Sequence, residues 1–97
     1  MVVTVKVKFL GVFRQISGRN QVRVRFERPA NVRETIKKLT ETFSPEFKRA
    51  VVDPELDDPR PNALVLVNGK EISALKGLET IIEDGDEFVL VPVSHGG

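Results

Sequence analysis

The sequence predicts an α+β domain of two layers, in which one main helix packs on one face of a mixed sheet of four to five strands. Near the N-terminus, apolar residues alternate with charged ones at the period of a β-strand. A single stretch in the middle of the chain has the apolar spacing of an amphipathic helix. The second half contains short apolar runs separated by turn residues, which is typical of further strands.

The first two strands are expected at residues 3–9 and 22–26, where every second residue is apolar. Gly18 and Asn20 lie between them and favour a turn, so the two strands should pair as a hairpin. The polar positions should face solvent, because the apolar positions are needed in the core. Four of these polar residues are basic: Lys6, Lys8, Arg23 and Arg25.

The main helix is expected to begin after Asn31, whose side chain can accept a hydrogen bond from an amide of the first turn. Glu34 follows at the spacing of a capping box. The residue before Pro45 avoids helical angles and should end the helix. Burying each residue of its apolar stripe is worth about 1.5–3 kcal/mol. The stripe consists of Val32, Ile36, Leu39 and Phe43.

Residues 45–61 follow the helix and are rich in proline, so they are predicted to form a loop. A single helical turn is expected near residues 47–51. The acidic run at residues 53–58 lacks the glycine and the spacing of a calcium-binding loop and should be solvated.

Three strands are expected beyond this loop. The apolar run 63–67 suits a buried strand, and Asn68-Gly69 is a strong hairpin signal that returns the chain through residues 70–72. A tight turn at residues 83–86 precedes a last strand at 87–91. An opening hairpin, a helical crossover and a last strand beside the first together define the β-grasp, or ubiquitin-like, arrangement.

A chain of 97 residues is long enough for one domain with one core. We expect the β-grasp domain to occupy residues 1–92 and a flexible tail to occupy residues 93–97. The absence of cysteine excludes disulfides and thiolate chemistry, and a single histidine excludes sites that need two. Residues 1–7 lack the apolar stretch of a signal peptide or membrane span, so a cytoplasmic protein without a membrane partner is expected.

The net charge of +1 conceals an uneven distribution. Residues 1–49 contain 12 basic and 4 acidic residues, whereas residues 50–97 contain 3 and 10. Either the two halves interleave in one sheet and neutralise each other, or the surface is bipolar and steers charged partners. Nucleic acid is not an expected partner, because the sequence has no tyrosine or tryptophan on which bases could stack.

The sequence ends in Ser94-His95-Gly96-Gly97, shortly after the last strand. Glycine loses more conformational entropy on ordering than any other residue and packs no side chain, so this ending does little for stability. A tail without Cβ atoms can, however, enter a narrow channel and bring its carboxylate to reacting groups. A frayed terminus without function is the competing interpretation.

The tail occurs together with Val67-Asn68-Gly69-Lys70, with Glu83-Asp84-Gly85-Asp86-Glu87, and with an opening Val5-Lys6-Val7-Lys8-Phe9 followed by Gly18. In this combination the whole chain resembles the MoaD/ThiS family of ubiquitin-like sulfur carriers. The opening strand is similar to that of MoaD-like members, the small subunits of molybdopterin synthase.

The resemblance implies that a partner adenylyltransferase of the ubiquitin-activating type adenylates the Gly97 carboxylate, beside Gly96, and that sulfur transfer leaves a thiocarboxylate. In MoaD-like members the large synthase subunit is catalytic and uses this sulfur to build the molybdenum cofactor. ATP, magnesium and the sulfur donor would come through the activating partner, and no bound cofactor or metal is expected here. A terminal carboxyl has a pKa of about 3.3–3.7, so it is an anion that can attack phosphorus at neutral pH.

By this resemblance the chain is expected to be the small, non-catalytic subunit of molybdopterin synthase, which donates its sulfur for molybdopterin synthesis. Two departures from the MoaD pattern leave that destination of the sulfur open. Only one proline, Pro92, precedes the tail, and His95-Gly96-Gly97 resembles the ending of modifiers of the Urm type. Those modifiers serve tRNA thiolation and can be joined to lysines of target proteins. An alternative of another class is a non-catalytic binding module with a basic sheet face and an inert tail.

By the same resemblance, partner binding is expected at Leu10, Val91, Pro92 and Val93, next to the tail. Completion of the core by Leu10 and Val91 is the competing interpretation, and strand alternation alone does not separate the two. His95 could contact the adenylate or a partner carboxylate, although a histidine in a tail is more often a solvated polar residue.

Overall fold

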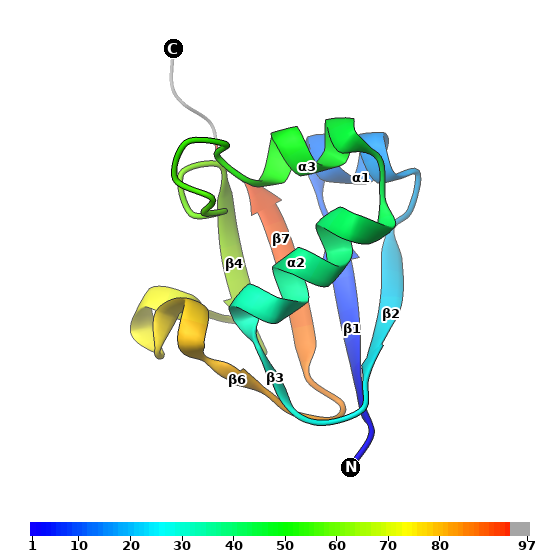
Figure 1. Cartoon of the computed structure of the whole chain (residues 1–97), viewed down its shortest axis with the longest axis vertical. Coiled ribbons are helices and arrows are strands. Elements are labelled where there is room, and N and C mark those ends of the chain that lie inside the picture. The colour runs from blue at the N-terminus through cyan, green and yellow to red at the C-terminus, as the bar shows by residue number, and fades with distance from the viewer. Residues whose placement is uncertain (94–97) are drawn as a thin grey trace.

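The structure, a computed structural model, describes residues 1–93 (Figure 1). The strands of its main sheet are β1 (Val3–Phe9), β2 (Gln21–Phe26), β4 (Ala63–Val67), β5 (Lys70–Glu71) and β7 (Glu87–Pro92). Their order in the sheet is β2-β1-β7-β4-β5. Neighbouring strands are antiparallel except β1 and β7, the first and the last, which are parallel. The predicted mixed sheet with a last strand beside the first is therefore confirmed.

Helices and a small second sheet complete the domain. The helices are α1 (Gly11–Ser17), α2 (Val32–Thr42) and α3 (Pro45–Val51), with short 3₁₀ turns η1 (Ile72–Ala74) and η2 (Gly77–Glu79). Two short strands, β3 (Ala30–Asn31) and β6 (Ile81–Ile82), pair with each other. Helix α2 crosses one face of the main sheet, whereas α1 and α3 lie near the end where β7 finishes (Figure 1). No helix within residues 1–93 has the length and apolar character needed to cross a membrane.

The predicted first hairpin forms, but its connection contains a helix and is not a simple turn. Strands β1 and β2 pair from Val3↔Phe26 to Lys8↔Gln21, and α1 occupies much of the connection. Helix α1 directs Phe13 and Ile16 toward the core and ends at Gly18, which has a positive φ of 74°. A helix of 7 residues with two core side chains is too short to show a clear helical period in the sequence.

Helix α3 replaces the first part of the loop predicted for residues 45–61. The Ser44 side chain accepts a hydrogen bond from the Phe47 amide at 3.2 Å, and Pro45 occupies the first turn, where its missing N–H is not needed. Phe47 and Val51 are buried. The expected single turn at residues 47–51 is thus the C-terminal part of a longer helix.

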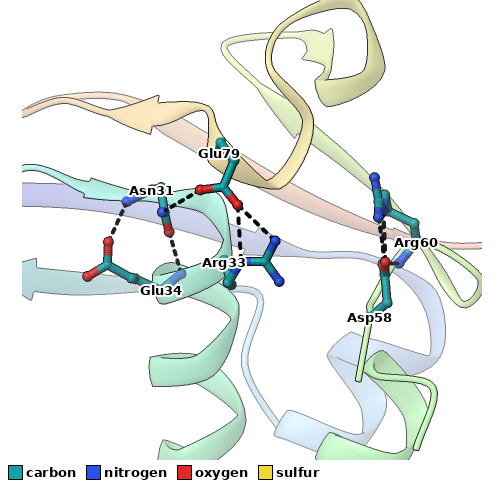
Figure 2. A network of polar contacts seen from close by, with 6 residues as sticks. All are labelled: Asn31, Arg33, Glu34, Asp58, Arg60 and Glu79. Carbon is teal, nitrogen blue, oxygen red and sulfur yellow. Dashed lines mark hydrogen bonds and ion pairs between the residues drawn. The ribbon is translucent and has the colours of Figure 1, made fainter. Parts of the chain in front are cut away.

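The predicted start of α2 is confirmed in detail (Figure 2). The Glu34 amide donates to the Asn31 side chain at 2.8 Å, and the Asn31 amide donates to the Glu34 carboxylate at 3.2 Å. This reciprocal pair is a capping box, which satisfies amides that the helix leaves without partners. The apolar stripe of α2 is buried through Leu39, and Phe43 at the end of the helix is half-buried.

The sheet order separates the basic half of the chain from the acidic half. Strands β1 and β2 come from the basic half and lie together, while β7, β4 and β5 come from the acidic half. The two groups meet where β1 pairs with β7, and there Lys8 and Glu87 form an ion pair at 3.2 Å. This arrangement favours a bipolar surface over the interleaved one.

Candidate functional site

The candidate site is the end of the sheet where β7 finishes, because the predicted reactive tail follows it. The predicted residues His95, Gly96 and Gly97 lie outside the described residues. The structure does describe Pro92 and Val93, which precede them, and every element that holds these two. It therefore shows how the point of departure of the tail, here called the exit, is built.

One anchor of the exit is a backbone hydrogen bond beyond the last strand. The Val93 amide donates to the Asn62 carbonyl at 3.0 Å. Asn62 is itself held by a turn, because its amide and that of Ala63 both donate to the Pro59 carbonyl, at 2.9 and 2.8 Å. The backbone is therefore held as far as Val93. The expected domain boundary, at Pro92, lies one residue earlier.

Pro92 ends β7 and is tolerated there for a geometric reason. It is paired with Ala63 of β4. The neighbouring pairs are Val91 with Leu64 on one side and Val93 with Asn62, which are hydrogen-bonded, on the other. Because hydrogen bonding alternates along an antiparallel pair, the nitrogen of Pro92 faces the other neighbour, β1. Strand β1 has already ended at Phe9, so no ladder bond is lost at the proline.

A second anchor is the contact between Pro92 and Gly11. Gly11 follows β1, begins α1 and has a positive φ of 54°. A Cβ atom at this position would lie 2.8 Å from Cγ of Pro92, which is closer than real Cβ atoms approach. The proline ring thus packs against the space that the Cβ atom of any residue other than glycine would occupy. Gly11 is required both for its backbone conformation and for this close approach.

An apolar surface adjoins the exit on the sheet face opposite α2. Alternation along the strands directs Phe88, Leu90 and Val65 into the core, and so directs Val91 and Leu64 outward as neighbours. Leu10 follows Phe9, the partner of Leu90, and therefore lies beside Val91. Leu10 is 45% exposed, Val93 40% and Leu64 37%. We call this surface the exit patch: Leu10, Leu64, Val91 and Val93.

The burial of Leu10 and Val91 tests one of their two interpretations, and partner binding stays a prediction. Neither residue belongs to the buried core, so the suggestion that they complete the core is wrong. Leu64, Gly11 and Asn62 are additional residues at the exit that were not predicted from the sequence. For Gly11 a signal was present, because a glycine shortly after a strand commonly marks a positive φ or a close approach of backbone.

An ion pair supports the loop that carries Asn62 (Figure 2). The Arg60 guanidinium donates to the Asp58 carboxylate at 2.6 Å, and the Arg60 amide donates to the same carboxylate at 2.8 Å. These hydrogen bonds hold the pKa of Asp58 below its ordinary value. Asp53 orders the preceding turn, where its side chain accepts from the amides of Glu55 and Leu56. The acidic run is thus an organised turn.

The described residues offer few groups for chemistry of their own. Within residues 1–93, no group of three or more histidine, cysteine, aspartate or glutamate side chains could hold a metal ion. The buried polar side chains of the same range are three threonines: Thr35, Thr40 and Thr80. What this end of the sheet provides is a fixed exit and an apolar surface beside it.

Comparison with known proteins adds to this geometry. Residues 7–97 match the model of the ThiS family. The chain is 28% identical over 92 residues to small archaeal modifier protein 3 of Haloferax volcanii, covering 95% of this chain and 97% of that protein. The solution structure of small archaeal modifier protein 1 from Methanosarcina acetivorans has a TM-score of 0.84 and 26% identity, covering 100% of this chain and 99% of that one.

A third match is a Pyrococcus furiosus protein assigned as subunit 1 of a molybdopterin converting factor. Its TM-score is 0.75 and its identity 25%, covering 95% of this chain and 99% of that one. These matches confirm the predicted β-grasp, ubiquitin-like fold and the resemblance to the MoaD/ThiS family.

Replacing Gly11 by alanine should destabilise the exit by more than backbone strain alone. A left-handed residue other than glycine costs about 1–2 kcal/mol, and crowding Pro92 should add about 1–3 kcal/mol. Gly18→Ala is the matched control, because Gly18 also has a positive φ but a Cβ there meets nothing within 4 Å. Denaturant unfolding measures both losses, and equal losses would contradict the contact. Pro92→Ala should relieve part of the penalty in the Gly11→Ala background.

Replacing Asp58 by asparagine should lower the stability of the fold at neutral pH and reduce the loss of stability on acidification. The pKa of Asp58 is lowered in the folded protein, so its carboxylate stabilises the fold above about pH 4 and ceases to do so as the pH falls through the folded pKa. The difference in melting temperature between the wild type and Asp58→Asn should therefore shrink on acidification. Asp57→Asn, at an exposed neighbour, is the control. A difference that stays constant from pH 7 to pH 2 would refute this role.

Proposed function

Because this chain belongs to the ThiS family of ubiquitin-like sulfur carriers and modifiers, we propose that it is activated at the carboxylate of Gly97 and then carries sulfur there as a thiocarboxylate. The observation that supports this most is the fixed exit. Pro92 and Val93 are held by Gly11 and Asn62 beside an exposed apolar patch. The family match also extends through residue 97.

The proposed cycle has two steps, and both take place at the carboxyl group of Gly97. A carboxylate oxygen of Gly97 attacks the α-phosphorus of ATP, so that pyrophosphate leaves and an acyl-adenylate forms. Hydrosulfide from a donor then attacks the acyl carbon. AMP leaves, and a thiocarboxylate remains. We assign ATP, Mg²⁺ and the sulfur donor to an activating partner, an adenylyltransferase, and place the cycle in the cytoplasm, where ATP is available.

The length of chain beyond the exit connects the chemistry to docking. Four residues follow Val93, and a fully extended chain of this length spans about 13–14 Å. A partner that receives Gly97 in its active site must therefore come close to the exit itself. Its surface would cover the exit patch, whose apolar side chains gain by leaving water.

Two uses of the activated terminus are supported by different similarities. The likeness to two archaeal modifier proteins, at 28% and 26% identity, supports conjugation to lysines of target proteins. The likeness to the Pyrococcus furiosus protein, at 25% identity, supports the donation of sulfur for molybdopterin synthesis through a large synthase subunit. We propose conjugation as the first use and molybdopterin synthesis as the second.

Incubation with ATP, sulfide and the activating enzyme should replace one oxygen atom of the chain by sulfur. Intact-mass spectrometry measures this exchange. A chain that lacks Gly96 and Gly97 should show no exchange, while its melting temperature stays unchanged because neither glycine carries a side chain to pack. No exchange in the full chain under saturating conditions would contradict the proposal, as would a natural gene product that continues past Gly97 unprocessed. Lysine conjugates in cells would separate the first use from the second.

Leu10→Lys should weaken binding of the activating enzyme, because it places a charge within the apolar contact. We expect a loss of about tenfold in affinity, by titration calorimetry, with little change in melting temperature since Leu10 is exposed. Ile81→Lys is the matched control: Ile81 is 54% exposed but lies in β6, outside the main sheet. Equal affinities of the wild type and Leu10→Lys would remove the exit patch from the interface.

A further inference from the structure

The outer edge of strand β2 is basic and adjoins a groove that the proposed function does not use. Strand β2 is the last strand on its side of the sheet, and the C-terminal half of α2 lies beside it (Figure 1). A groove of about 650 Å³ runs between them. It is lined by Arg19, Gln21, Val22, Arg23, Val24, Arg25, Lys38, Leu39, Thr42 and Phe43. These lining residues, all within the described range, include four bases and no carboxylate.

The backbone along this edge is oriented for pairing with a further strand. The Phe9 amide donates to the Asn20 carbonyl, which sets the alternation of the β1–β2 ladder. By that alternation, the N–H and C=O groups of Gln21, Arg23 and Arg25 point away from β1. Among residues 1–93, the Lys38 ammonium donates to the Arg25 carbonyl, at the end of this row. The outward N–H and C=O groups of Gln21 and Arg23 can therefore form hydrogen bonds with an added strand.

The two sides of the edge differ in chemistry, and this difference specifies the side chains of an added strand. On the side toward α2, the groove has an apolar floor that includes Val22, Leu39 and Phe43. On the opposite side, Arg23 is exposed and is paired in register with Lys6, and Arg25 is exposed beside them. Successive side chains of a strand point to opposite faces. An added strand would therefore place alternate residues against the apolar floor and against the arginines.

We propose that this edge, Gln21–Arg25 with the groove beside it, binds an extended acidic peptide of a protein partner, in which carboxylates alternate with apolar residues. The peptide adds to β2 as a sixth strand of the sheet, so main-chain hydrogen bonds hold it and its side chains select it. Carboxylates meet Arg23 and Arg25, and apolar side chains enter the groove. The Lys38 ammonium, 4.8 Å from the centre of the Phe26 ring, lies where it can pair with a further carboxylate.

Two other occupants fit less well. A second copy of this chain would bring the arginines of its own β2 against these, and like charges directly opposite one another are destabilising. Single-stranded RNA would satisfy the charge, but its bases need exposed aromatic rings. The phenylalanines nearest the groove, Phe26 and Phe43, are half-buried, and Phe26 is covered by Lys38.

The test uses the full chain and a short capped peptide in which glutamate alternates with valine. We expect the backbone amide resonances of Gln21, Arg23 and Arg25 to shift on titration, and the Gln21 and Arg23 amides to exchange more slowly with solvent. A block peptide of the same composition, with all glutamates before all valines, should bind about tenfold more weakly. Equal affinity for both peptides, or shifts confined to other strands, would overturn the proposal.

Two pairs of variants separate the backbone contribution from the charge contribution. Gln21→Pro removes an outward N–H at the first residue of the strand, where proline is tolerated, and should abolish the slowed exchange and weaken binding; Gln21→Ala should not. Arg23→Glu with Arg25→Glu should weaken binding about tenfold, whereas Lys48→Glu with Arg49→Glu, an equal charge change on exposed positions of α3, should leave it unaltered.

Two outcomes would assign the groove to another occupant and so overturn the proposal. One is an oligouridylate that shifts the same amides while the alternating peptide does not. The other is a concentration-dependent dimer in sedimentation that Gln21→Pro disrupts without any peptide present. Binding of the peptide to a chain unable to accept sulfur at Gly97 is expected, because the groove lies two strands away from β7 and is independent of the activation chemistry.

Discussion

The parallel pairing of the first strand with the last is the interaction on which the exit depends. Its register places Phe9 opposite Leu90, and that pair brings Gly11 onto Pro92 and Leu10 beside Val91. A slip of one residue would move every side chain of a strand to the other face. The burial of alternate residues in β1 and β7 therefore fixes the exit as firmly as it fixes the core.

The helices that surround this end of the sheet provide its rigidity. Phe9 of β1 contacts Phe43 and Phe47 in edge-to-face geometry, at centroid distances of 5.5 and 5.4 Å, and Phe13 of α1 reaches Phe47 as well. Aromatic pairs of this geometry add about 0.5–1.5 kcal/mol each beyond the area they bury. The strand that precedes Gly11 is thus held by α1, α2 and α3 together. A reactive terminus benefits from such support, because packed side chains hold its point of departure in place.

The sheet presents two different surfaces for partners, one on each side of β1. The exit patch lies over β7 and β4 and is apolar, whereas the edge of β2 is basic and has unpaired backbone groups. Neighbouring strands are about 4.8 Å apart, so β2 and β7 are separated by about 10 Å. The uneven charge of the sequence becomes a spatial division because the basic strands are neighbours.

The amino-acid sequence by itself determined the period of each strand, the capping box at Asn31 and Glu34, and the family, because these depend on residues close together in the chain. Only the tertiary structure decided that α1 and α3 are helices and that Leu10 and Val91 face outward. It also decided that Gly11 receives the ring of Pro92 and that β2 is an edge. Each of these depends on which segments become neighbours, and Gly11 and Pro92 meet across most of the length of the chain. Local periodicity does not predict such pairings, because they are set by the register of the whole sheet.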